Sequence, residues 1–266
     1  MGKSKIDLLK YFWCLWCLFR LSVVFAHPQI IDTRTEFQKL MSQQPYVSPN
    51  VSIAIPSAYG IGWGAAFLGA AGQLGTTTST RPFGQYGVGF GLGDPNKYLG
   101  LATALSFGGL DDITRDGNFS FQLAHNFMKT GSAIAIGAQN GLAWGSTANG
   151  RLSYYLNASK VFPLDFKNGY AMNIIGTIGV GNARFVRDIG AQPEDYHRLG
   201  PFGSVALQLL PQVTVIGEYV GKAFNTGLSV IPFTKIPLVA TIATLNLNTS
   251  GRHIPIAGGL AYVIFF

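Results

Sequence analysis

The residues that could carry out chemistry are few, and they gather in two polar stretches. Glu194, Asp195 and His197 stand close together in one stretch, and Asp111 adjoins Asp112 in another. Facing Asp–Asp or Asp–His pairs can activate a water molecule, so these groups could serve a hydrolase at a surface. The alternative is a pair of solvated acidic loops that meet divalent cations. We favour the loops and expect no catalytic residue.

The remaining candidates for chemistry are weaker. His125 shares a predicted apolar strand face with Leu123, and that face offers no Ser or Asp partner for a lipase-like site. We interpret His125 as an interfacial histidine. Metal-ligand spacing such as H-x₃-H is absent from the sequence. The glycine-rich runs do not precede a helix, as phosphate-binding loops do. We therefore expect neither a metal site nor any other cofactor.

The elements that must position these residues are short and apolar. Hydrophobic residues make up 48% of the 266 residues and charged residues only 12%, which is about half the usual charged fraction. After residue 26, no stretch offers the roughly 18 unbroken apolar residues of a membrane helix. A chain with 34 glycines and this profile indicates a β-structure that faces lipid.

Residues 1–26 have the features of a secretory signal peptide. Lysines precede an apolar run over 11–25 that ends at Ala26. The alternative is an uncleaved anchor helix. Both cysteines, Cys14 and Cys17, lie within this leader, so a cleaved chain would contain no disulfide.

Charge and composition after the leader narrow the possible partners. Four of the 19 Lys and Arg and one of the 12 Asp and Glu lie in the leader, so the net charge falls from +7 to +4 on cleavage. No basic cluster with interleaved aromatics remains, which argues against nucleic-acid binding. Residues 27–56 are more polar and include a possible short helix over 35–41. We interpret 27–56 as a periplasmic arm or a plug, with a flexible lead-in as the alternative.

From residue 57 onward the sequence alternates with a period of two, as transmembrane strands do. The clearest case is 118–128, where Phe119, Phe121, Leu123 and Phe127 alternate with Ser120, Gln122, Ala124 and Asn126. The first set suits lipid and the second suits a lumen. Glycines at alternate positions, as at 87, 89 and 91, would permit curvature and close packing. The predicted strands are 58–68, 83–93, 98–107, 117–128, 132–140, 151–162, 169–182, 202–210, 212–221, 224–232, 236–246 and 254–266.

The predicted connections alternate in length, apart from the one near Lys222. Short connections such as 94–96 and 129–131 alternate with long ones such as 69–82 and 183–201. Bacterial barrels combine short periplasmic turns with longer outer loops and an even number of strands. The sequence therefore predicts an all-β fold, namely a closed antiparallel transmembrane β-barrel of about twelve strands spanning 57–266.

The C-terminus is the most specific motif. Leu260, Tyr262, Ile264 and Phe266 alternate, and the chain ends on the aromatic residue. This ending resembles the C-terminal signal of bacterial outer-membrane β-barrels. The resemblance implies a location in the outer membrane of a Gram-negative-type bacterium. It also implies outer-membrane lipids, lipopolysaccharide and the barrel assembly machinery as partners.

A second resemblance covers about fifteen residues. The segment 218–221, Glu-Tyr-Val-Gly, is followed by Asn-Thr-Gly-Leu-Ser at 225–229. It resembles a hairpin of the YjbH-like barrels, which are linked to exopolysaccharide production, although Val220 stands where that hairpin usually has Asp.

The predicted lumen is polar and almost uncharged. By strand parity we expect Glu218 and Lys222 to form a pair there and Lys160 to face the same interior. The principal lumen-lining residues that we predict are Ser120, Gln122, Asn126, Gln139, Asn157, Asn173, Thr177, Gln208, Glu218 and Lys222. These features favour a narrow passive channel for small, weakly charged solutes. The alternatives are a non-conducting envelope scaffold or exopolysaccharide-secretion accessory and, second, a surface hydrolase.

Overall fold

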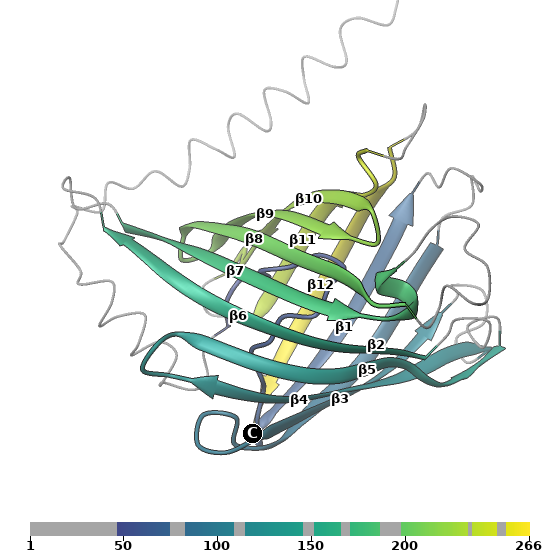
Figure 1. The fold of residues 1–266 in the computed structure, drawn as a ribbon, viewed down its shortest axis with the longest axis horizontal. Coiled ribbons are helices and arrows are strands. Elements are labelled where there is room, and N and C mark those ends of the chain that lie inside the picture. Colours follow the sequence, from purple (N-terminus) through teal and green to yellow (C-terminus); the bar gives the residue numbers. More distant parts are fainter. Residues whose placement is uncertain are drawn as a thin grey trace, which may run out of the picture.

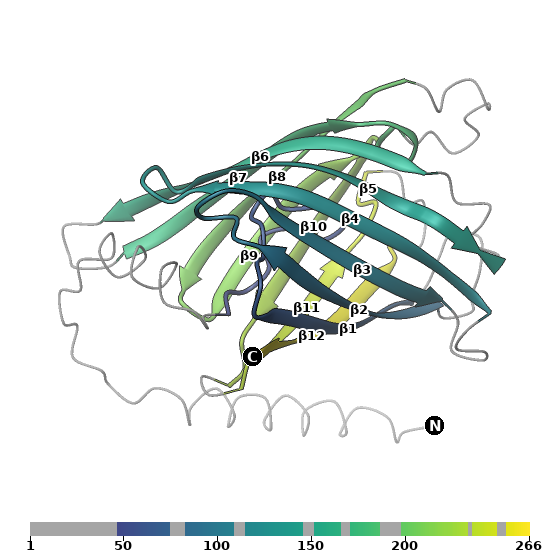
Figure 2. The same ribbon diagram turned by 90° about the horizontal axis from the view of Figure 1, so that it is seen from below.

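Twelve antiparallel strands form a closed barrel in which every strand pairs with its sequence neighbour and β1 pairs with β12 (Figures 1 and 2). This computed structural model describes residues 47–74, 83–108, 115–145, 152–165, 171–186, 198–233, 236–248 and 254–266. Within those ranges, no helix is both long and apolar enough to span a bilayer. The strands are β1 (Ala65–Leu74), β2 (Phe83–Gly93), β3 (Gly100–Gly108), β4 (Asp116–Phe127), β5 (Ser132–Trp144), β6 (Ser153–Asp165), β7 (Ala171–Gly181), β8 (Gly200–Leu210), β9 (Val213–Val220), β10 (Ala223–Val230), β11 (Leu238–Thr244) and β12 (Ile256–Phe265).

The predicted all-β class, strand number and closure are confirmed, but the predicted first strand is wrong. We expected it over 58–68 and a loop over 69–82, whereas β1 covers Ala65–Leu74. Residues 69–72 read Gly-Ala-Ala-Gly and lack alternating large apolar groups. Closure requires them, because Gly69 pairs with Ala261 of β12 and Gly87 of β2 along the seam.

The two rims of the barrel differ in the connections that they carry. The start of β1, the end of β12 and the turns 94–99, 128–131 and 211–212 lie at one rim, here called the short-turn end, where β6 and β10 also end and β7 and β11 begin. The opposite rim, here called the long-loop end, is where β1, β3, β5, β7, β9 and β11 end and where the even-numbered strands begin. As expected, the turn at Gly221 and Lys222 is the exception, because it is short although it lies at the long-loop end.

Apolar side chains lie on the outer face of the wall and small or polar side chains lie on the inner face, as the sequence pattern predicts. In β4, Phe121 and Phe127 are exposed on the outer face, whereas Ala124 and Asn126 are buried on the inner face. The same alternation in β6 exposes Leu156 outside and buries Asn157 inside. The exterior is therefore apolar and the interior is mixed, which is the reverse of a water-soluble barrel.

Inward-facing glycines receive aromatic rings from adjacent strands. A Cβ atom at Gly89 would overlap the ring of Phe67, and one at Gly179 would overlap the ring of Phe202. The phenol of Tyr155 lies in the same way across Gly137. Since each ring lies where a side chain of the next strand would stand, these glycines allow bulky residues to fit against the wall.

Candidate functional site in the barrel interior

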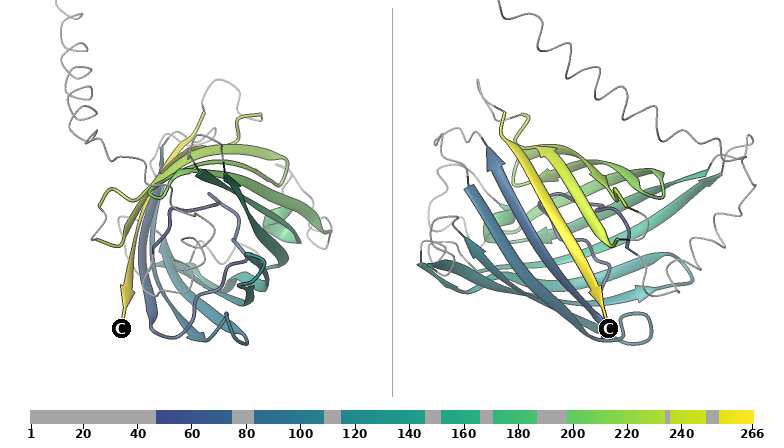
Figure 3. Two further views of the ribbon diagram at one scale, coloured as in Figure 1. Left: turned by 90° about the vertical axis from the view of Figure 1, so that its left-hand side faces the viewer. Right: turned by 180° about the vertical axis from the view of Figure 1, so that it is seen from behind.

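The interior is occupied by the residues that precede β1. This inner segment (residues 47–64) enters the lumen at the short-turn end, turns back inside it and leaves at the same end to begin β1, as the dark purple trace in Figure 3 shows. Asn50 lies beside Ser229, near the short-turn end of β10, and Ile55 lies beside Tyr155, towards the other rim. Ala58 and Gly60, which we expected to belong to the first strand, therefore lie inside the barrel, whereas Trp63 is exposed at the short-turn end.

Glu218 of β9 is the strongest anchor of the inner segment. Its carboxylate accepts hydrogen bonds from three successive backbone N–H groups, those of Ile53 (2.7 Å), Ala54 (3.0 Å) and Ile55 (3.3 Å). The amide of Asn225 donates a further bond of 2.9 Å. The side chain of Glu218 is 1% exposed, so four donors satisfy a carboxylate that water does not reach.

Other polar side chains of the wall bind the inner segment along its whole length. Together with Glu218 they come from six strands, and each bonds a backbone group or, for Thr241, a side chain. They are Asn126 of β4 to Gly60, Asn157 and Ser159 of β6 to Pro56 and Ala58, Ser204 of β8 to Val51, Ser229 of β10 to Asn50, and Thr241 of β11 to the amide of Asn50. The polar lumen is thus largely used to fix the segment that fills it.

The short 3₁₀ helix η2 (Ala183–Phe185) closes the long-loop side of this arrangement. Arg184 donates to the carbonyl of Ala54 at 2.8 Å and to Gln139 at 2.6 Å. Phe185 is 1% exposed and packs with Ile55, Tyr155 and Phe202. The tip of the inner segment therefore contacts both a charged side chain and an aromatic cluster.

Tyr59 lies in the part of the inner segment that runs back towards β1, and it fixes this part to the short-turn end. Its hydroxyl donates to the carbonyl of Gly131 at 2.8 Å, and burial raises the pKa of this phenol, so the group stays protonated as a donor. We expect Tyr59→Phe to destabilise the barrel by about 1–3 kcal/mol, because a part-buried acceptor loses its partner. Urea unfolding of the refolded protein measures this loss, and an unchanged midpoint would show that the bond contributes nothing.

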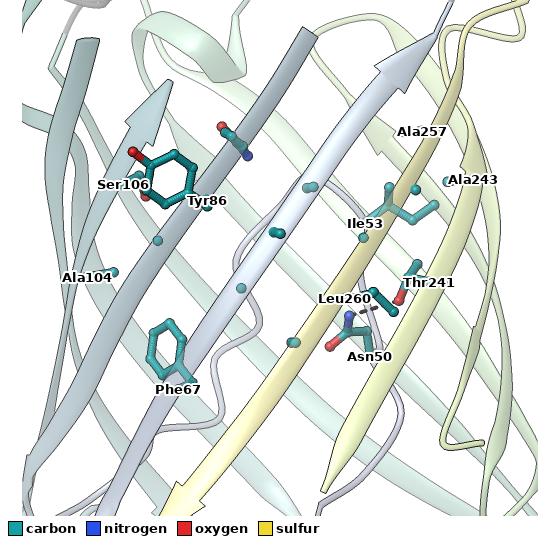
Figure 4. A pocket seen from close by; sticks show the side chains of 18 of the residues that line it. Asn50, Ile53, Phe67, Tyr86, Ala104, Ser106, Thr241, Ala243, Ala257 and Leu260 are labelled. Carbon is teal, nitrogen blue, oxygen red and sulfur yellow. Dashed lines mark hydrogen bonds between the residues drawn. The ribbon is translucent and has the colours of Figure 1, made fainter. Parts of the chain in front are cut away.

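A cavity of about 300 Å³ remains between the inner segment and the wall made by β11, β12, β1, β2 and β3 (Figure 4). The inner face of this wall consists almost wholly of small residues, among them Gly69, Ala71, Gly87, Ala104 and Gly259. Among the described residues that line the cavity, none is acidic, basic or a histidine. The inner segment therefore fills one side of the lumen and leaves an uncharged space on the other.

The predicted lumen-lining residues lie at inward strand positions, with one exception. Lys222 lies in the β9–β10 turn at φ 69° and is exposed, so the predicted Glu218–Lys222 pair is wrong. The expectation for Lys160 is also wrong, because it is exposed on the outer face, with its ammonium 5.3 Å from the centre of the Phe162 ring. Backbone N–H groups of the inner segment and the amide of Asn225 satisfy the Glu218 carboxylate, and strand parity cannot reveal that.

The other predicted positions bond the inner segment or side chains elsewhere in the barrel. Asn126, Gln139, Asn157 and Glu218 act as described above. Gln122 accepts from Tyr155, Thr177 bonds Ser159, Asn173 donates to Gln208, and Ser120 bonds Asn118. Whether they line a conducting path remains a prediction.

The candidates for chemistry gain no support from the described residues. The structure does not describe the two acidic stretches with Asp111, Asp112, Glu194, Asp195 and His197, nor residues 1–46 with the predicted leader. The predictions for these residues are therefore not tested. His125 contacts the carbonyl of Tyr98 and packs edge-on against Phe127 at 4.6 Å. Within the described ranges, no group of three or more His, Cys, Asp or Glu is placed to hold a metal ion.

The chain has a distant likeness to known proteins. No family model and no curated protein matches it. Among solved structures, it is similar to an outer membrane channel from Pseudomonas putida F1, with 11% identity, a TM-score of 0.44, and coverage of 81% of this chain and 100% of that one. Such a distant likeness assigns no function. The class that the coordinates define is a closed twelve-stranded antiparallel barrel with an inward-folded N-terminal segment.

Proposed function

We propose that the chain is an outer-membrane β-barrel whose interior forms a narrow passive channel for small, weakly charged solutes. The observation that carries this proposal is the uncharged cavity beside the inner segment, enclosed by a complete barrel wall. In a cavity of this kind an ion would find no oppositely charged side chain, whereas a neutral solute does not need one.

The exterior supports a membrane location. Large apolar side chains stay exposed around the barrel, including Ile136 at 57%, Ile178 at 73% and Leu260 at 54%. At the short-turn end, Trp63 contacts Phe266 edge-on at 5.9 Å, and both are exposed. Aromatic residues at a rim suit the interface of a bilayer. Outer-membrane lipids and lipopolysaccharide are the surroundings that we propose, and the barrel assembly machinery is the partner that would read β12.

The test is conductance of the refolded protein. Intact barrels migrate differently before and after boiling, so a gel first establishes that the protein has folded. Folded protein in a planar bilayer is then expected to give small, stable conductance steps. A silent bilayer with correctly folded protein would contradict the channel.

We expect the channel to discriminate weakly between cations and anions. Selective pores use rings of charged side chains, and the cavity has none among its described lining residues. In a tenfold salt gradient the reversal potential should stay close to zero. A reversal potential near the value for either ion alone would exclude the cavity as the conducting path.

A second candidate is a non-conducting barrel that acts as an envelope scaffold or exopolysaccharide-secretion accessory. The observation that favours it is the number of hydrogen bonds that fix the inner segment, from six strands and from Arg184. A silent bilayer, together with altered surface polysaccharide or envelope integrity in a deletion strain, would favour this candidate.

A further inference from the structure

Two sets of polar side chains in the lumen differ in what they contact. The first set bonds the inner segment or a neighbouring strand, and Glu218, Asn126 and Ser159 are examples. The second set lines the cavity and consists of Ser52, Gln85 and Ser106, whose side chains bond no group in the described part of the chain. The same cavity is lined by Asn50, whose amide nitrogen donates to Thr241 at 3.0 Å while its amide oxygen accepts no bond from the described residues.

These groups surround the cavity from different elements. Asn50 and Ser52 come from the inner segment, Gln85 from β2 and Ser106 from β3. Figure 4 shows Asn50 and Ser106 on opposite sides of the space, with Thr241 beside Asn50. Hydroxyls and amides supply both donors and acceptors without net charge. A solute between them would be held through its own hydroxyl or amide groups.

An aromatic face completes the lining. Phe67 lies in the cavity wall, with its ring over Gly89 of β2. Most of the other lining residues are Gly and Ala, which permit close approach of a ligand to the backbone. A flat ring beside hydroxyl and amide groups matches a molecule with an apolar C–H face and a polar rim.

We infer that this cavity binds a neutral polyhydroxylated solute of about monosaccharide size. The inference rests on the proposed function, because the cavity is the proposed path. A volume of about 300 Å³ is at the lower end for ligand pockets, which limits the solute to a small one. An ionised solute would find no opposite charge, and a wholly apolar one would leave the amides and hydroxyls without partners.

The experiment measures sugar binding separately from conduction. Refolded wild-type protein is titrated with D-glucose in the planar bilayer, and saturation-transfer NMR detects binding of the same sugar in micelles. D-Gluconate serves as the charged counterpart. The test variant is Gln85→Leu, which removes an amide from the cavity. The control is Thr214→Val, which removes a buried hydroxyl from β9 that has no partner among the described residues and does not line the cavity.

We expect glucose to reduce the conductance saturably and to give a transfer signal, and gluconate to do neither. Gln85→Leu should weaken glucose binding several-fold, whereas Thr214→Val should leave it unchanged. Conduction without any saturable effect or signal from glucose would overturn the inference and leave the channel intact. A glucose signal from a silent barrel would overturn the channel and leave the binding site. Equal binding of glucose and gluconate, or equal loss in both variants, would also overturn the inference.

Discussion

Replacing Glu218 by Ala is expected to raise the conductance of the barrel several-fold. In the native protein its carboxylate accepts from the N–H groups of Ile53, Ala54 and Ile55 and from the amide of Asn225. Hydrogen bonds to a charged group contribute about 1.5–3 kcal/mol each, so the substitution removes the main attraction between β9 and the inner segment. Three backbone donors would then lose their acceptor, and we expect the inner segment to move away from the wall as these donors become hydrated. Single-channel recording in a planar bilayer measures the result.

Two further variants separate loosening of the inner segment from general damage. Glu218→Gln keeps one acceptor oxygen but loses the charge, and it should give an intermediate conductance. Thr214→Val changes the same strand without removing a hydrogen bond among the described residues, and it should match the wild type. Boiled and unboiled gel samples establish that each barrel is closed. Wild-type conductance from a closed Glu218→Ala barrel would mean that the remaining anchors suffice to fix the inner segment.

The barrel wall could be read from the sequence because its physical cause is local. Strands in contact with lipid must place apolar groups on alternate residues, and β4 shows this with Phe121 and Leu123 outside and Gln122 and Ala124 inside. Closure follows because no backbone group can remain unpaired in hydrocarbon. The contact with lipid acts on residues close together in the chain. It therefore appears in the sequence as an alternation of apolar and polar residues with a period of two.

The first strand shows where this local reading fails. Residues 58–68 alternate well enough to resemble a strand, yet Ala58 and Gly60 bond side chains of β6 and β4 from inside the lumen. The true strand continues through the Gly and Ala residues at 69–72, whose pattern carries no sign of a lipid face. The pairing of β1 with β12 joins residues almost 200 positions apart, so no short window of sequence can reveal it.

For the interior, the sequence predicted only which kinds of residue line it. Polar residues at inward positions were expected, and most of them lie there. Their partners were not visible, because some are backbone groups of the inner segment, as for Asn157, and others are side chains distant in the sequence, as Tyr155 is for Gln122. Glu218 illustrates the limit. A lone buried acid suggested a lysine partner, whereas backbone N–H groups and the amide of Asn225 satisfy it.

Gly89→Ala should reduce the conductance strongly, because Gly89 makes room for the ring of Phe67. A Cβ atom at this position would overlap the ring, which lies against β2 and borders the cavity. We expect the displaced ring to move into the cavity that Phe67 lines, where it would narrow the proposed path. Planar-bilayer conductance and glucose-dependent swelling of liposomes should therefore fall together.

The double variant Gly89→Ala/Phe67→Ala distinguishes this displacement from damage to the strand. A Cβ atom at Gly89 would also stand 2.5 Å from the carbonyl oxygen of Thr103 on β3, so part of any effect could come from the wall itself. If the ring is responsible, removing it restores conductance to the wild-type level or above, and Phe67→Ala alone exceeds the wild type. If the double variant stays closed while its gel shift shows an intact barrel, the Phe67 ring does not control the path. The cavity would then be a pocket in the wall and not a section of a channel.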